Sequence, residues 1–337
     1  MAKRAGKQSV RIERPVYVRS VAAVAGPKEG RGPLGKHYDH VYDDNIAGEQ
    51  TFEKAERAMM KDAALRAIQK AGLTTGDLDF FLAGDLLNQV TVANFTALKV
   101  GVPFLGLYGA CSTSAESLAL GSVLVDSGAA KNVVIATSSH NDAAERQYRY
   151  PTEYGYQRRP YAQWTVTGSG AAVLSAEAGN VKVTGFTAGR VHDAGVKEPY
   201  NLGAAMAPAA ADTIITHLND FELTPDDYDL ILTGDLGSFG TEMLFQQLAA
   251  GSGVNISKQH KDCGLMIYGS EEDVHAGGSG CASSALVVFG YIVKALTEGE
   301  LKRVLLVATG ALHSPTTFQQ GENIPSIAHA VILERGE

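Results

Sequence analysis

Residues 80–85 read Phe-Phe-Leu-Ala-Gly-Asp and residues 230–235 read Leu-Ile-Leu-Thr-Gly-Asp, so a short apolar run ends at the same Gly-Asp pair twice. A second pair of apolar runs follows, Val-Val-Ile-Ala-Thr at 133–137 and Leu-Leu-Val-Ala-Thr at 305–309. Between its runs, each copy holds a turn of small residues that leads into an apolar helical pattern. The repeated order predicts an internal duplication of one α/β unit. Two such halves, packed face to face, would place their strand ends around one shared cleft.

The remaining pattern supports two similar halves. Apolar residues recur at helical spacing over residues 49–71 and again over 204–218, in each case before one of the Gly-Asp strands. Strands that alternate with helices predict mostly parallel sheets covered by helices. No linker rich in Pro, Ser or Gly separates the copies, so we expect one compact body whose halves are residues 1–179 and 180–337.

Composition excludes several classes of protein. The 337 residues carry a formal net charge of −8, which argues against a nucleic-acid binder. Three cysteines are too few for a disulfide framework. The best candidate for a membrane span, residues 284–293, is closed by Lys294 and is far shorter than the roughly 20 residues needed. The basic N-terminal residues predict a solvated tail, with a contact to an anionic membrane as the alternative: Lys3, Arg4, Lys7, Arg11 and Arg14.

Cys111 has the strongest chemical signal. A predicted strand ending near residue 107 turns through Gly109 and Ala110 into a helix that begins near Ser112. A thiol at a helix start meets the positive end of the helix dipole and unpaired backbone N–H groups, both of which favour a thiolate. The pattern therefore indicates a nucleophile or an anion contact, and the alternative is a small buried cysteine in a tight turn.

Two resemblances rest on these motifs. Gly-Ala-Cys-Ser at 109–112, the internal repeat and His-Ala-Gly-Gly at 275–278 resemble the thiolase and β-ketoacyl synthase superfamily, in which a first-half cysteine accepts an acyl group and a second-half histidine assists. Cys111 and His275 stand at those two positions. Longer strings, at 80–89, 104–114, 136–141 and 144–155, resemble the stage V sporulation protein AD family of spore-forming bacteria. Both resemblances imply a thiolase-like, five-layered α-β-α-β-α fold built from two duplicated halves.

The second resemblance also implies a role in binding. Proteins of that family bind dipicolinic acid (pyridine-2,6-dicarboxylate) or its calcium chelate and act with membrane proteins of the stage V sporulation A complex, which move it into and out of the spore. It implies a soluble protein associated peripherally with the spore inner membrane, with no cofactor beyond calcium carried by the chelate and no nucleic-acid partner. A homodimer through residues 133–136 and a monomer both remain open.

Departures from the thiolase pattern favour a catalytically degenerate protein. Gly234-Asp235-Leu236 stands where thiolases carry Asn-Glu-Ala-Phe and β-ketoacyl synthases carry His-Gly-Thr-Gly. The second thiolase cysteine is replaced by residues 308–313. Half of the polar groups that would stabilise a carbanion or enolate are thus missing. The alternative is an active acyl transferase that uses Cys111 and His275.

A planar dianion with an aromatic ring needs cations and stacking surfaces. One segment offers both, because it carries four arginines among six aromatic residues: Arg146, Arg149, Arg158 and Arg159 among Tyr148, Tyr150, Tyr154, Tyr156, Tyr161 and Trp164. This segment is interpreted as a ligand contact, or alternatively as a dimer contact or lid. Asp85 and Asp235 follow equivalent strands and are interpreted as contacts to chelated calcium or as helix caps. His140 and His313 also follow equivalent strands, as structural or ligand-binding histidines. The expected ligand site has no certain metal ligand and comprises Asp85, Asn88, Cys111, His140, Arg146, Arg149 and His275.

Overall fold

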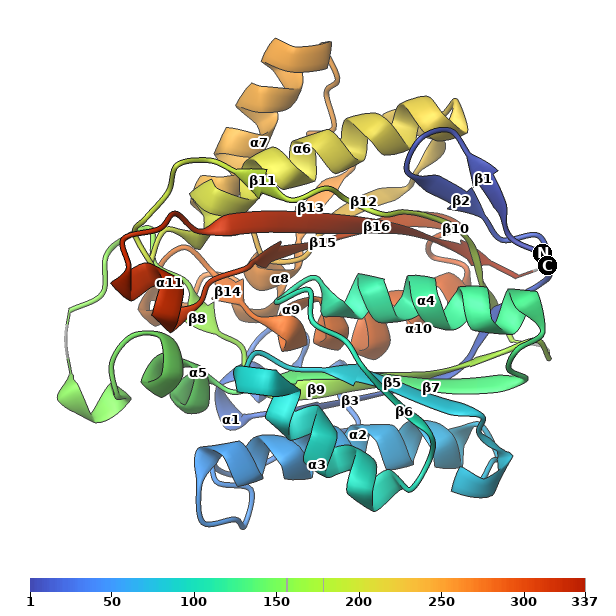
Figure 1. Ribbon diagram of the computed structural model, residues 1–337, viewed down its shortest axis with the longest axis horizontal. Coiled ribbons are helices and arrows are strands. Elements are labelled where there is room, and N and C mark those ends of the chain that lie inside the picture. The colour runs from blue at the N-terminus through green and yellow to red at the C-terminus, as the bar shows by residue number, and fades with distance from the viewer. Residues whose placement is uncertain (156, 178, 337) are drawn as a thin grey trace.

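The computed structural model describes residues 1–155, 157–177 and 179–336, and it shows five layers in the order α-β-α-β-α (Figure 1). Two sheets lie between three layers of helices, as the sequence predicts. Each sheet carries the strands of one half, and the two are joined edge to edge where β10 pairs with β3 over Val181↔Val18 and Lys182↔Tyr17.

The first sheet runs in the order β3-β9-β7-β5-β6. The pair β5–β7 is parallel, with Phe80 opposite Val133, and β5 also pairs in parallel with β6 at the edge. The strand β9 runs antiparallel to both of its neighbours, β3 and β7. The strand bounds are β3 Tyr17–Ala25, β5 Phe80–Gly84, β6 Phe104–Gly106, β7 Asn132–Ser139 and β9 Gly168–Ser175.

The second sheet repeats this arrangement in the order β10-β16-β15-β12-β13. The pairs β12–β15 and β12–β13 are parallel, and β15–β16 and β16–β10 are antiparallel. The Gly-Asp strands β5 and β12 thus occupy equivalent places, which confirms the duplicated thiolase-like fold. The expected boundary at 179/180 falls between β9 and β10. The strand bounds are β10 Val181–Thr187, β12 Leu230–Thr233, β13 His260–Asp262, β15 Arg303–Ala311 and β16 Pro325–Arg335.

Helices cover both sheets and fill the space between them. The outer layers are α2 with α3 over the first sheet and α6 with α7 over the second, and α4, α9 and α10 lie in the middle (Figure 1). Alanine is frequent where α2 and α6 meet their sheets, because small side chains allow close approach. The bounds are α2 Phe52–Lys70, α3 Thr91–Val100, α4 Thr113–Ser127, α6 Leu202–Phe221, α7 Gly237–Ser252, α9 Cys281–Val287 and α10 Val293–Glu298.

Shorter elements connect the layers. The N-terminal hairpin β1–β2 pairs with β10, so the first residues of the chain belong to the sheet of the second half. The pair β8–β14 joins the halves near Cys111 through the register Gly278↔Trp164. The strand bounds are β1 Lys3–Ala5, β2 Ser9–Arg11, β4 His40–Val41, β8 Trp164–Thr165, β11 His192–Asp193 and β14 Gly278–Ser279. The helix and turn bounds are α1 Pro27–Gly30, α5 Asn141–Tyr148, α8 Cys263–Tyr268, α11 Pro315–Gln319, the π-helical stretch Val288–Ile292 and the 3₁₀ turns Gly35–His37, Thr75–Asp77, Asn88–Val90, Thr152–Tyr154, Pro225–Asp227 and Glu272–Val274.

Two expectations need correction. The sheets are mixed and not purely parallel, because one strand in each five-stranded sheet, β9 in the first and β16 in the second, runs opposite to the other four. Residues 133–136 cannot provide a dimer edge, because β7 is buried between β5 and β9. The edge strand of the first sheet is β6.

Within the described parts of the chain, residues 281–298 form the one helical stretch whose length and composition would allow it to cross a membrane. Its placement speaks for a core helix, since 78% of that window is buried inside the protein.

Candidate functional site

The site is built around the turn that joins β6 to α4. Ala110 has a φ of +50°, an uncommon backbone conformation for a residue with a Cβ atom, and it precedes Cys111. The turn is held by the Ser112 hydroxyl, which donates to the Gly109 carbonyl at 2.6 Å, and by the Thr113 hydroxyl, which donates to the Ala110 carbonyl at 2.7 Å. Gly310 of β15 lies against it so closely that a Cβ atom there would be 2.2 Å from the Gly109 oxygen.

Second-half residues surround the thiol of Cys111. Its sulfur lies 4.0 Å from the Ser279 hydroxyl oxygen, and that hydroxyl donates to the Asp235 carboxylate at 2.9 Å. Asp235 also accepts from the Thr309 hydroxyl at 2.6 Å and from the Gly280 N–H at 3.0 Å. Asp235 therefore caps the start of α9. It does not cap α7, the helix that follows it in the sequence, because the first N–H groups of α7 donate to Asp262.

This environment holds the thiol in its neutral form. Burial raises the pKa of the Cys111 thiol well above its usual range, and the adjacent Asp235 carboxyl raises it further. The helix-start position alone favours a thiolate, but desolvation of the charged form is the larger effect here. Of the two interpretations of Cys111, the small buried cysteine in a tight turn is the one that this environment supports.

His275 does not meet Cys111 in this structure. Its backbone has a φ of +51° and its side chain is exposed to solvent, whereas Cys111 is only 5% exposed. The second-half residue beside the sulfur is Ser279, four positions later. The left-handed backbone at His275 starts the turn that brings Gly278 and Ser279, and not the imidazole, to the cleft.

Two further expected ligand contacts act as helix caps. Asp85 is fully buried, and its two carboxylate oxygens accept from the N–H groups of Leu87 at 2.9 Å and Ala93 at 2.8 Å, at the start of α3. Of the two interpretations of Asp85, the helix cap is the one that this geometry supports. His140 is also fully buried: Nδ1 accepts from the Asp142 N–H at 3.2 Å, so its proton lies on Nε2, 2.7 Å from the Asn45 carbonyl oxygen. Burial lowers the pKa of His140, so it caps α5 as a neutral ring.

The two expected arginines have different surroundings. Arg146 is half exposed and pairs with Glu53 at the start of α2, away from Cys111. The guanidinium group of Arg149 is 6% exposed and binds Glu145 through two hydrogen bonds, Nε–Oε2 at 2.9 Å and Nη2–Oε1 at 2.6 Å. Arg149 also donates to the Pro199 carbonyl at 3.2 Å and lies over the Tyr200 ring. Among the other residues of this segment, Arg158 lies over Trp164, and Tyr156 is outside the described residues.

Arg149 and Cys111 line a small inner cavity of about 30 Å³, close to the volume of one water molecule in the liquid. An outer groove of about 400 Å³ adjoins it and includes Asn88. The two share Leu86, Tyr108, Tyr148 and His313, so these four residues form the wall between them. The hydroxyl oxygens of Tyr108 and Tyr148 are 3.5 Å apart, and Tyr148 donates to the Leu86 carbonyl.

His313 is the member of this wall that the predicted site omitted. It is 7% exposed, and its Nε2 has no hydrogen-bond partner among the described residues. Burial lowers its pKa to about 4 and the nearby Arg149 acts in the same direction, while a hydrogen bond with the Tyr148 backbone opposes them, so the ring is neutral near pH 7. The available signal was its position just after β15, equivalent to that of His140 after β7. The structure thus brings Asn88, Cys111 and Arg149 to connected spaces and places Asp85, His140, Arg146 and His275 elsewhere.

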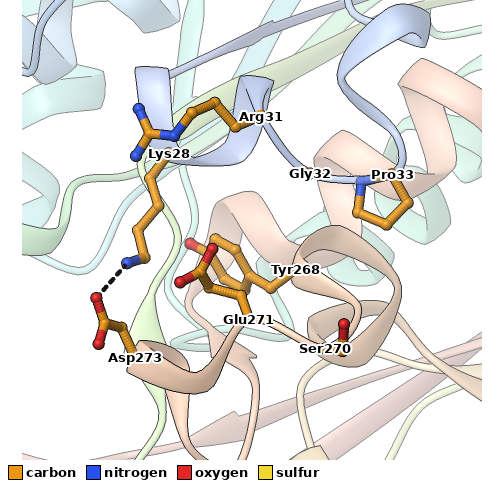
Figure 2. Close-up of a pocket in the computed structure, with 8 residues that line it drawn as sticks. All are labelled: Lys28, Arg31, Gly32, Pro33, Tyr268, Ser270, Glu271 and Asp273. Carbon is orange, nitrogen blue, oxygen red and sulfur yellow. Dashed lines mark ion pairs between the residues drawn. The ribbon is translucent and has the colours of Figure 1, made fainter.

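A larger hollow, of about 670 Å³, lies between α1 and the segment after α8 (Figure 2). Its walls carry two cations, Lys28 and Arg31, and two carboxylates, Glu271 and Asp273, and Lys28 pairs with Asp273 at 3.8 Å. His275 follows on the same segment. Charges of both signs largely balance here, so the hollow has no clear preference for an anion despite its size.

No group of three or more His, Cys, Asp or Glu side chains is arranged to hold a metal ion in the described parts of the chain. The Asp85 and Asp235 carboxylates, the expected calcium contacts, are already occupied by backbone N–H and hydroxyl donors.

Comparisons with known proteins agree with this architecture. Two solved structures of similar fold are 3-oxoacyl-[acyl-carrier-protein] synthase III of Aquifex aeolicus VF5, 17% identical with a TM-score of 0.58 over 99% of this chain and 100% of that one, and OleA of Xanthomonas campestris, 12% identical with a TM-score of 0.61 over 96% and 99%. At such low identity they establish the thiolase-like fold alone.

The sequence comparisons go further. The pattern of stage V sporulation protein AD matches residues 6–334. Stage V sporulation protein AD of Bacillus subtilis (strain 168) is 52% identical over 330 residues, which cover 98% of this chain and 97% of that protein. The chain therefore belongs to the stage V sporulation protein AD family.

Proposed function

We propose that this sporulation protein binds dipicolinate, or its calcium chelate, in the two connected spaces beside Cys111, and that it serves the transport of this ligand into or out of the spore. The observation that carries the proposal is the unpartnered Nε2 of buried His313 in a wall of tyrosine rings. A buried polar atom without a partner loses roughly 1–3 kcal/mol relative to a hydrogen-bonded one, so a ligand carboxylate at this position is favoured.

The outer groove has the size for the aromatic ring. Its volume of about 400 Å³ lies within the range of roughly 300–1,000 Å³ that is usual for small-molecule sites. Tyr108 and Tyr148 offer faces for stacking, and a neutral His313 ring that carries its proton on Nε2 can donate to a carboxylate. Arg149 lies behind them and supplies a positive field to the carboxylate that points inward.

The inner cavity is too small for the ligand as it stands. A cavity of about 30 Å³ admits only a small part of the ligand, such as one carboxylate oxygen. Cys111 then forms the apolar end of the pocket.

The state of Cys111 supports a binding role over acyl transfer. A nucleophilic cysteine needs a lowered pKa or an adjacent base. Here burial raises the pKa of the thiol, its hydroxyl neighbour Ser279 donates to Asp235, and His275 is at the surface. We therefore propose that the protein has kept the cleft of the thiolase-like fold without its catalysis.

Partners and location belong to the same proposal. We propose that calcium enters as part of the chelate, that the protein acts with membrane proteins of the stage V sporulation A complex, and that it associates peripherally with the spore inner membrane. A homodimer would use the edge strand β6, where Leu105 of the strand and Tyr108, two residues after it, are exposed. Such an edge offers unpaired backbone groups to a second copy.

Calorimetric titration tests the ligand and its place together. Dipicolinate is compared with isophthalate, which has the same two carboxylates but no ring nitrogen, against wild type, His313→Phe and His275→Ala. We expect wild type to bind dipicolinate and His313→Phe to bind at least about tenfold more weakly, because a charge-assisted hydrogen bond is lost. His275→Ala should bind as wild type does. No binding to wild type, or a loss confined to His275→Ala, would refute the proposed site.

A separate measurement addresses catalysis. Intact-protein mass after incubation with acyl-CoA thioesters should show no acyl adduct on Cys111, with Cys111→Ala as the background control. Steady-state turnover at about 1 per second or faster would establish the acyl transferase instead.

A further inference from the structure

A basic groove lies in the outer layer of the first half, where α2 and α3 pack side by side (Figure 1). Its volume is about 220 Å³, and four cations line it: Lys54, Arg57, Lys61 and Lys99. Glu49 is its one lining carboxylate. A net of three positive charges is thus gathered at one groove of a chain whose formal net charge is −8.

Within the described residues, none of the four cations of the groove forms an ion pair with a carboxylate. Their positive charges are therefore not neutralised by acidic side chains of that part of the chain. Two acidic residues of α2 already have other cationic partners: Glu53 pairs with Arg146, and Asp62 pairs with Arg66 at 2.7 Å. Lys54, Arg57 and Lys61 recur at helical spacing, so α2 presents them on one face.

The floor of the groove combines an aromatic ring with buried polar atoms. The guanidinium of Arg57 lies 3.8 Å from the centre of the Phe95 ring, which holds it in place while the ring stays 47% exposed. Thr96 is 1% exposed and lines the groove, yet its hydroxyl has no hydrogen-bond partner among the described residues. The Nε atom of Arg57 is also buried without a hydrogen-bond partner among those residues. Buried polar atoms of this kind normally have a partner.

We propose that this groove binds the phosphate group of an organic phosphate. A phosphate offers three acceptor oxygens and up to two negative charges, which suits several converging cations and a hydroxyl donor better than a single carboxylate does. The carbon part of the ligand packs on Phe95. The phosphate belongs either to a soluble compound or to a phospholipid headgroup, since both present the same chemistry to the groove.

This site is separate from the one proposed for dipicolinate. The groove is on the outer helical layer of the first sheet, whereas Cys111, Arg149 and His313 face the space between the halves. Loss of one activity therefore leaves the other measurable, and dipicolinate titration serves as a check that a variant is folded.

Two probes and two charge-matched variants test the proposal on the full chain. ADP is the soluble probe, followed by calorimetry, and phosphatidylcholine vesicles with or without phosphatidylglycerol are the lipid probe, followed by co-sedimentation. The groove variant is Lys61→Glu with Lys99→Glu. The control is Lys258→Glu with Lys261→Glu, which makes the same charge change at two exposed lysines of the second half.

We expect at least one probe to bind wild type and the control alike, and to bind the groove variant at least about tenfold more weakly. Thr96→Val, which keeps the shape and removes the hydroxyl, should weaken the same probe by about tenfold or less. A response to ADP identifies a soluble ligand, and a response only to phosphatidylglycerol vesicles identifies a headgroup. The proposal is overturned if neither probe binds wild type, or if the groove and control variants lose binding equally.

Discussion

Replacing Arg149 with methionine should damage the protein far more than the same change at Arg146, three residues earlier. The Arg149–Glu145 pair is buried, at 6% and 5% side-chain exposure, and is bidentate. Removing Arg149 leaves buried Glu145 with only the longer contact to Arg158, at 3.8 Å, which destabilises by up to about 3–5 kcal/mol. The Arg146–Glu53 pair is 48% and 27% exposed, so its loss costs roughly 0–1 kcal/mol.

Urea unfolding of both variants, followed by circular dichroism, measures this difference. A double-mutant cycle with Glu145→Gln isolates the pair, and we expect a coupling free energy above about 1.5 kcal/mol. Dipicolinate affinity, measured where the variants remain folded, should fall at least about tenfold for Arg149→Met, because the positive charge behind the groove is lost, and should be unchanged for Arg146→Met. Equal effects of the two methionine variants on stability would refute the contrast drawn from burial.

Three further predictions concern the cleft and its supports. Cys111 should react with iodoacetamide at neutral pH at least about tenfold more slowly in the folded protein than in urea, because burial raises its pKa; equal rates by mass spectrometry would contradict this. Gly310→Ala should destabilise by about 1–3 kcal/mol in urea unfolding, since its Cβ would be 2.2 Å from the Gly109 oxygen; an unchanged midpoint would show that β15 can move. Burial raises the pKa of Asp262 to about 6 from 3.8, so the folded state binds its proton more tightly and wild type loses stability as pH rises through this range. Asp262→Asn lacks that loss, so its stability relative to wild type should rise by up to about 3 kcal/mol between about pH 4 and pH 7, and a constant difference would count against the raised pKa.

The sequence predicts the fold well because its signals are local and repeated. The runs at 80–85 and 230–235 become β5 and β12, and the turn before Cys111 becomes the connection between β6 and α4, as expected. The directions of the strands were harder to predict from the sequence. An isolated apolar run does not show whether it runs parallel or antiparallel to its neighbours, so the reversed direction of β9 and β16 was not predicted.

The site was predicted less completely, because side-chain direction depends on single backbone angles. The His275 side chain is exposed to solvent, and Ser279, four positions later, lies beside Cys111 in its place, which the sequence alone does not reveal. Whether a histidine after a strand caps a helix or faces a cavity is also decided in three dimensions. His140 finds Asn45 and the N–H of Asp142, whereas the equivalent His313 finds no partner for Nε2 among the described residues.

The crystal structure of the protein with dipicolinate is the most direct test of the central claim. We predict the pyridine ring in the outer groove, against Tyr108 and Tyr148, with one carboxylate within hydrogen-bonding distance of the His313 Nε2 and directed toward the cavity at Cys111. A ligand found instead in the hollow beside Lys28 and Arg31, or a groove left empty at saturating ligand, would contradict the account.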